Sequence, residues 1–142
     1  QPVILDAANG KILLKLEGRT RERPLSEWGT WPLAWSPDGS RLAGAGDGSL
    51  LVWDAVNGDM LFTLNEDTWR VTTVAWSPDG AWLASGSWYG TIQIWDARSG
   101  EAWGTLVRYN APVRALAWSP DGRWLAGGSH DGIVQLWSVG AR

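Results

Sequence analysis

The sequence is poor in the residue types that build catalytic and metal sites. Its 142 residues contain no cysteine, which excludes a disulfide framework and thiolate ligands for a metal ion. The one histidine, His130, cannot form a metal site unless carboxylates supply all the other ligands. No apolar run approaches the roughly 18 residues of a membrane span, and no secretory signal is visible. We therefore expect no metal, no membrane partner and a cytoplasmic location, which the absence of cysteine fits.

Charge is also scarce and nearly balanced. Lys and Arg together number 12 and Asp and Glu 15, which gives a net charge of −3. A weakly acidic chain is a poor match to phosphates, so we expect no nucleic-acid partner. The glycines stand at turn positions and form no P-loop motif. His130 and Asp131 are sequence neighbours, which does not supply the geometry of a Ser-His-Asp triad. The sequence therefore favours neither an enzyme nor a bound cofactor.

Tryptophan, by contrast, is abundant, with 13 residues, most of which recur at a fixed spacing. The pentapeptide WSPDG stands at 35–39, 76–80 and 118–122, and Trp53, Trp95 and Trp137 each close an apolar run. Short alternating runs separated by Asp-Gly or Ser-Gly turns are the pattern of antiparallel strands in a meander. The Asp of each WSPDG copy is expected to bond its own backbone in a turn, not to act in catalysis. A period of about 40–45 residues with a Trp-Asp ending is typical of propeller blades.

The repeats resemble the WD-repeat family of β-propellers. Trp53-Asp54 and Trp95-Asp96 match the dipeptide that names the family, and Trp137-Ser138 is a degenerate third copy. The resemblance implies an all-β chain of blades, each with four antiparallel strands, called a to d from the propeller axis outward.

The family also implies a buried hydrogen-bonded set in each blade, which joins a His, a Ser or Thr, an Asp and the Trp of strand c. Asp47 and Asp131 match the Asp of this set, but Tyr89 replaces it in the middle blade. Asp67 and Tyr109 stand where the family has its His. Because no blade has the full set, we expect packing to compensate.

The resemblance divides the chain into part of one blade and three further blades. Residues 1–16 are expected to be strands c and d of a split blade, 17–30 an inserted loop, 31–65 the first blade, 66–107 the second, and 108–142 a third blade without strand d. Three blades cannot close a ring of ordinary geometry, and an open stack would leave an apolar face at each end.

The two ends are complementary, which suggests that copies of the chain close a ring together. In the WD-repeat family an N-terminal strand completes the last blade. We therefore expect Lys11–Leu16 to complete the third blade of another chain, where Ile133–Trp137 takes the place of Pro2–Asp6. Two chains would form six blades and three would form nine. We expect a homodimer, with a homotrimer as the alternative.

The resemblance also implies that the d–a and b–c loops lie together on one face, where partners often dock. The residues carried onto that face are Trp28, Trp69, Arg70, Trp88, Tyr89, Tyr109 and His130. Trp, Tyr and Arg are the usual anchors of interfaces, so we predict a non-enzymatic scaffold that binds a protein or peptide. Three alternatives stay open. The aromatics could instead cover the incomplete hydrogen-bonded sets, the chain could be a ring-forming fragment without a ligand, natural or engineered, or the loops could bind a small ligand or a sugar.

Overall fold

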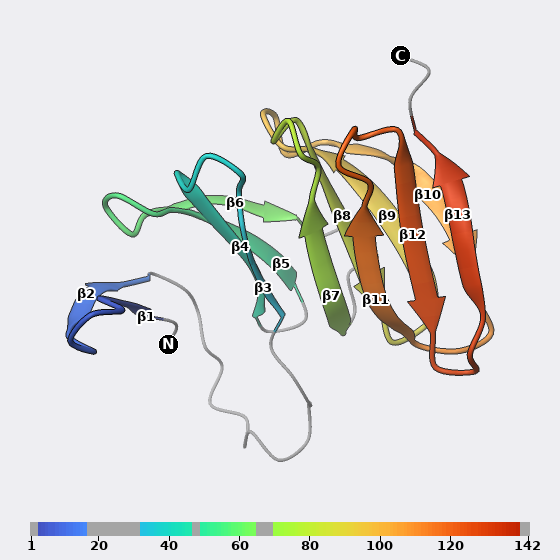
Figure 1. Cartoon of the computed structure of the whole chain (residues 1–142), viewed down its shortest axis with the longest axis horizontal. Coiled ribbons are helices and arrows are strands. Elements are labelled where there is room, and N and C mark those ends of the chain that lie inside the picture. The colour runs from blue at the N-terminus through green and yellow to red at the C-terminus, as the bar shows by residue number, and fades with distance from the viewer. Residues whose placement is uncertain (1–2, 17–31, 47–48, 65–69, 140–142) are drawn as a thin grey trace.

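The computed structural model describes residues 3–16, 32–46, 49–64 and 70–139. Within these residues, thirteen strands form four antiparallel sheets that follow one another in chain order (Figure 1). The described residues include no helix, and therefore none that could span a membrane. The all-β fold class and the four-stranded antiparallel blades expected from the sequence are confirmed.

Each sheet is a meander in which consecutive strands pair. The N-terminal hairpin consists of β1 (Val3–Leu5) and β2 (Ile12–Lys15). Blade 1 consists of β3 (Leu33–Trp35), β4 (Arg41–Gly46), β5 (Ser49–Asp54) and β6 (Met60–Leu64). Blade 2 consists of β7 (Val71–Trp76), β8 (Trp82–Ser87), β9 (Thr91–Asp96) and β10 (Ala102–Arg108). Blade 3 consists of β11 (Val113–Trp118), β12 (Trp124–Ser129) and β13 (Val134–Ser138), three strands within the described residues.

The turn between the first two strands of each blade is built by its Ser-Pro-Asp-Gly sequence. In blade 1, Oδ1 of Asp38 accepts hydrogen bonds from Ser36 Oγ at 2.7 Å and from Ser40 N at 2.9 Å. These two bonds hold the pKa of Asp38 at about 2, well below its ordinary value of 3.8. Asp79 and Asp121 accept the equivalent bonds in blades 2 and 3. The three carboxylates therefore shape turns, as their sequence context indicates.

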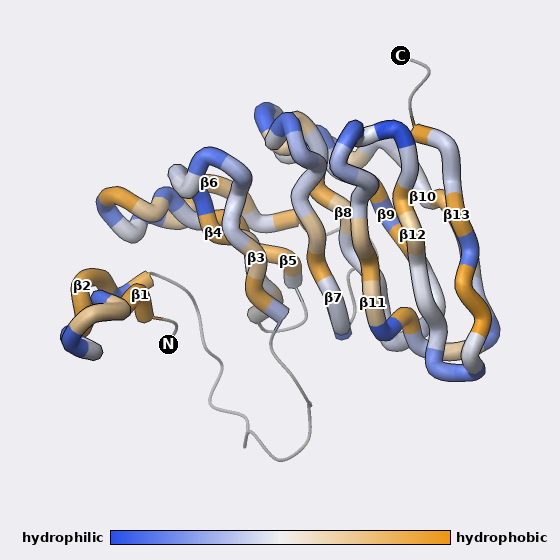
Figure 2. The backbone as a smooth tube through the Cα atoms, in the orientation of Figure 1, coloured by the Kyte–Doolittle hydropathy of each residue, from blue (hydrophilic) through white to orange (hydrophobic). Residues whose placement is uncertain are grey.

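The core lies between the sheets, because the faces of neighbouring sheets that meet are buried against each other. Leu50 and Val52 of blade 1 are buried with Val74 and Trp95 of blade 2. Residues of blade 2 are buried in the same way against blade 3, and the opposite face of blade 1 packs on Leu14 and Leu16 of the N-terminal hairpin. Figure 2 shows the hydrophilic residues gathered at the turns, away from these layers.

A repeated hydrogen bond joins neighbouring blades near the propeller axis. The Trp that ends strand a donates from Nε1 to a carbonyl in strand a of the preceding blade. Trp76 bonds to Ala34 O at 2.9 Å, and Trp118 bonds to Ala75 O at 3.1 Å. Trp35 is half-exposed, because the N-terminal hairpin that precedes blade 1 has no strand a within the described residues. Within the described residues, the contacts between blades are therefore regular, and the two end sheets are only partly covered.

Candidate interaction surface

The connection between blades 2 and 3, and the turns that join the second and third strands of these two blades, lie at one end of the stack, the lower edge in Figure 1. We call this end the loop face. Arg70 precedes β7, Trp88 and Tyr89 form the turn between β8 and β9, and His130 lies in the equivalent turn of blade 3. Trp88 is 39% exposed and Tyr89 is 63% exposed. Large aromatic side chains therefore reach solvent here in spite of the apolar layers available between the blades.

Trp88 is the centre of a small cluster of cationic side chains. The guanidinium carbon of Arg70 lies 4.8 Å from the centroid of the Trp88 ring, and that of Arg114, from β11, lies 5.1 Å from it. Nε of Arg114 also donates a hydrogen bond of 3.4 Å to Nδ1 of His130. We call these four residues the Arg–Trp platform. It spans blades 2 and 3, and each Arg makes a cation–π contact with the same indole.

The local backbone holds this cluster in place. Arg70 has a φ of +59°, the one positive φ of a non-glycine residue in the described part of the chain. Its carbonyl accepts a hydrogen bond of 2.9 Å from the backbone N–H of Trp88, which fastens the turn to the start of β7. In blade 3, His130 N donates to Pro112 O in the same way, at 2.8 Å. A left-handed residue other than glycine is strained, and such strain gathers at functional sites.

Tyr89 and Asp131 occupy equivalent turn positions with different outcomes. Asp131 accepts a hydrogen bond from Ser129 Oγ, as the family pattern implies for the Asp of the buried set. Tyr89 cannot accept such a bond into its turn, and in blade 2 Ser87 Oγ instead accepts from Thr91 N at 3.1 Å. Because the turn of blade 2 has Tyr89 in place of this Asp, the Tyr89 side chain does not bond into the turn and projects into solvent.

Tyr109 does not lie on the exposed loop face where we expected it. It is 8% exposed, its hydroxyl donates to Gly127 O at 3.1 Å, and its ring meets that of Trp137 edge to face at 6.3 Å. Burial, and secondly the charge of Asp131, raise the pKa of the Tyr109 hydroxyl. Blade 2 has Ser85 where blade 3 has Gly127, and Ser85 Oγ accepts from Trp95 Nε1 at 2.9 Å. Tyr109 is thus the packing that compensates for an incomplete hydrogen-bonded set.

The remaining predicted positions divide between core and turns. Trp53 and Trp95 are buried, and Trp137 is partly buried against the core shared by blades 2 and 3. Oδ1 of Asp54 accepts from Val56 N and Asn57 N, and Oδ1 of Asp96 accepts from Arg98 N and Ser99 N. The Ser99 and Arg98 bonds lower the pKa of Asp96. Trp28, Trp69 and Asp47 lie outside the described residues.

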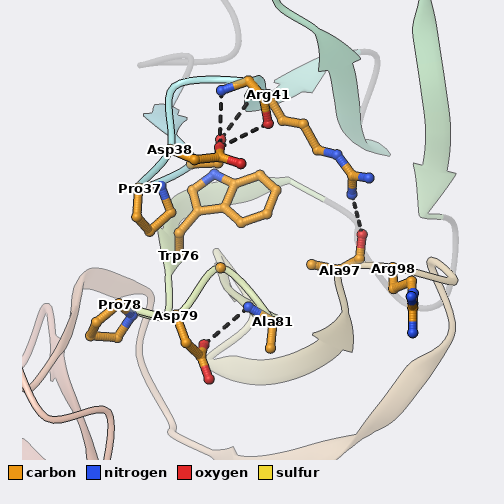
Figure 3. Close-up of a pocket in the computed structure, with 12 residues that line it drawn as sticks. Pro37, Asp38, Arg41, Trp76, Pro78, Asp79, Ala81, Ala97 and Arg98 are labelled. Atoms are coloured by element: carbon orange, nitrogen blue, oxygen red, sulfur yellow. Dashed lines mark hydrogen bonds between the residues drawn. The ribbon is translucent and has the colours of Figure 1, made fainter.

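Two features of the surface were not predicted from the sequence. One is Arg114, which lies inside a predicted strand. The other is a cavity of about 500 Å³ at the opposite end of the stack, between the Ser-Pro-Asp-Gly turns of blades 1 and 2 (Figure 3). The sequence does indicate a difference at this place, because Arg41 stands where the other blades have Trp82 and Trp124. In the structure Arg41 Nη1 donates to Ala97 O at 2.6 Å across the cavity.

The cavity offers no arrangement for metal or nucleophilic chemistry among its lining residues. Asp38 and Asp79 both line it, and each uses Oδ1 within its own turn. Within the described residues, no three His, Cys, Asp or Glu side chains gather closely enough to hold a metal ion. The exposed aromatic and cationic groups of the loop face are therefore the more distinctive chemistry of this surface.

The family model for the WD domain, G-beta repeat, matches residues 33–54, 58–96 and 101–138. The chain belongs to the WD-repeat family. Its second and third WD repeats begin at Gly58 and Glu101, just before the last strand of one blade, and end on the third strand of the next, at Asp96 and Ser138. Each of these repeats therefore links two blades covalently. No curated protein matches the chain.

Proposed function

We propose that the chain is a non-enzymatic scaffold that holds a protein or peptide partner on its loop face, around Trp88. WD repeats generally mediate protein interactions. The observation that carries the proposal is an exposed Trp beside exposed Tyr89 and two Arg side chains. Trp, Tyr and Arg dominate the binding energy of protein interfaces when they are rigidly held. Both guanidinium groups here are held against one ring, which reduces the entropy that binding has to overcome.

Site-specific photocrosslinking tests this proposal. A photoreactive phenylalanine analogue would replace Tyr89 on the loop face or, as the matched control, Val56, an exposed residue of the turn between β5 and β6 at the other end of the stack. We expect a discrete crosslinked partner from position 89 only, and its loss in the Trp88→Ala variant. Equal crosslinking from both positions, or crosslinking that survives Trp88→Ala, would contradict the proposal.

The exposed apolar residues at the two ends of the stack favour a second function, which is assembly of copies into a closed ring. Ile92 and Ile94 in β9 are fully buried against blade 3, whereas Val134 and Leu136, at the same positions of β13, are 71% and 66% exposed. At the other end, Trp35 of blade 1 is half-exposed, because no strand a precedes blade 1 within the described residues. Each end thus presents the half of an inter-blade interface that the other lacks. We propose that a second copy covers both ends, forming a homodimer of six blades, or a homotrimer.

Strand exchange specifies the pairing within such a ring. In blade 2, Gln93 of β9 pairs with Thr105 of β10, and Gln135 of β13 is the equivalent of Gln93. In the single chain, β2 pairs with β1, so that Lys15 lies opposite Val3. We propose that Gln135 of one copy takes the place of Val3 opposite Lys15 of the next.

A designed disulfide tests this pairing without interference, because the chain has no cysteine. Residues opposite one another on neighbouring strands have Cα atoms about 4.5–5.5 Å apart, which a disulfide can bridge. We expect Lys15→Cys with Gln135→Cys to yield a disulfide-linked dimer under mild oxidation. The control is Thr63→Cys with Gln135→Cys, since Thr63 already pairs with Leu51 inside blade 1. Crosslinking of equal yield in both variants would contradict strand exchange.

A further inference from the structure

Arg114 is held in position on the loop face by two contacts. Its guanidinium lies over the Trp88 ring, and its Nε donates to Nδ1 of His130. Arg114 is exposed, and among the described residues no carboxylate pairs with it. A cation that is fixed in place, open to solvent and not paired with a carboxylate of the described residues is suited to an external anion.

The fold does not require an Arg at this position. The equivalent residue of blade 2 is Thr72, whose Oγ1 donates to the carbonyls of Gly86 and Val113 and so joins blades 2 and 3. At the same strand position of blade 3, Arg114 extends outward and contacts the ring of Trp88 in blade 2. The strained backbone at Arg70 places a second guanidinium over the same ring. The platform is therefore specific to the junction of blades 2 and 3.

The two contacts leave a defined part of the Arg114 guanidinium available. The cation–π contact places the guanidinium over the indole, and the bond to His130 uses Nε. The four N–H groups on the two Nη atoms lie in the guanidinium plane, where an edge can donate two parallel bonds to a carboxylate or a phosphate. Since the cation–π contact and the His130 bond already hold the group, little further freedom is lost when an anion binds.

We propose that the Arg–Trp platform binds an anionic side chain of a peptide, a carboxylate or a phosphorylated hydroxyl, with an apolar neighbour of that side chain packed on exposed Trp88. The inference rests on the proposed loop-face function and names the chemistry that this face recognises. Asp131, the carboxylate of the adjoining turn, uses Oδ1 to accept the Ser129 hydroxyl. Arg114 donates the specific bonds, Trp88 supports Arg114 and contacts the apolar neighbour, and His130 is a positioning residue.

Oriented peptide libraries test the inference with the intact chain. Four libraries of degenerate nonapeptides would carry a fixed central phosphoserine, glutamate, serine or lysine, and retention on immobilised protein would be measured for each. We expect the phosphoserine or glutamate library to be retained about tenfold more than the serine library, because a charge-assisted bidentate bond is worth roughly a factor of ten or more. Preference for phosphoserine over glutamate would identify a modified partner, and equal retention would identify a constitutively acidic one.

Two variants of equal charge decide which Arg is responsible. Arg114→Gln should remove the preference for an anion. Arg123→Gln, which removes an exposed Arg from the turn between β11 and β12 at the other end of blade 3, should preserve it. Loss of the preference in both variants, or in neither, would overturn the inference. Equal retention of the serine, glutamate and phosphoserine libraries, with all three lost in Trp88→Ala, would overturn it while supporting the loop-face scaffold. Retention of no library by the unmodified chain would refute both.

Discussion

Replacing Leu136 by Asp should separate an assembled ring into single chains. If a second copy covers Leu136 as blade 3 covers Ile94, the 66% of the side chain now exposed becomes buried. Full burial of a Leu contributes about 1.5–3 kcal/mol, so this part contributes about 1–2 kcal/mol. An aspartate there would also lose water without gaining a partner, at a cost of about 1–3 kcal/mol. The change therefore weakens each junction by about 2–5 kcal/mol.

A two-chain ring has two such junctions, so the total loss is about 4–10 kcal/mol. Every 1.4 kcal/mol is about tenfold in the dissociation constant, which should rise about a thousandfold or more. The assay is light scattering behind a sizing column across a dilution series. The unmodified chain should have about twice its mass of 15.5 kDa, and Leu136→Asp should have the single mass.

The control is Val56→Asp, which introduces the same charge at an exposed apolar residue away from both end faces and should leave the mass unchanged. Three times the chain mass would indicate nine blades and a homotrimer. An unmodified chain that is a single-mass species at every concentration would refute ring closure by copies of this chain. A Leu136→Asp variant with the mass of the unmodified assembly would refute the role of this face.

Three further predictions concern stability and are measured by urea unfolding. Tyr109→Phe should lower the free energy of unfolding by about 1 kcal/mol through loss of the bond to Gly127 O, whereas no change would mean that the hydroxyl is satisfied equally well by water. The depressed pKa of Asp38 means that its turn bonds contribute stability above about pH 4 and that this contribution is lost as pH falls towards 2; Asp38→Asn should therefore flatten the pH dependence in that window, and an unaltered slope would contradict the assignment. Gly90→Ala should destabilise more than Gly132→Ala, because both glycines have positive φ but only a Cβ at Gly90 would lie 2.1 Å from the carbonyl oxygen of Tyr109; equal losses would show that backbone strain alone matters.

The strands and turns could be predicted because their causes are local. The bonds of Asp38 in its turn join residues two apart, and β8 and β9 are short runs with turn residues on either side. These strands run from Trp82 to Ser87 and from Thr91 to Asp96, and a turn follows each of them. The small errors occur where pairing with another strand decides the boundary. β13, for example, begins at Val134, one residue after the predicted start.

The loop-face residues could be predicted only in part, because their exposure depends on what the neighbouring blade supplies. Tyr109 has the composition of an interface residue, but a glycine at position 127 of the next blade leaves room for its ring and a carbonyl for its hydroxyl. Arg114 has the pattern of an ordinary strand residue, and its contact with Trp88 crosses from one blade to another. Neither relation follows from the local pattern of either residue.

The sequence by itself determined that this protein is a stack of WD-repeat blades, because a meander is formed by contacts between residues near one another in the chain. The tertiary structure alone decided which side chains the blades bury against one another and which they leave outside. That division depends on packing across blades, because Val134 and Leu136 stand at the positions of Ile92 and Ile94 but have no blade over them within the described residues. The repeat pattern therefore determines the fold, and the packing between blades determines which side chains are exposed.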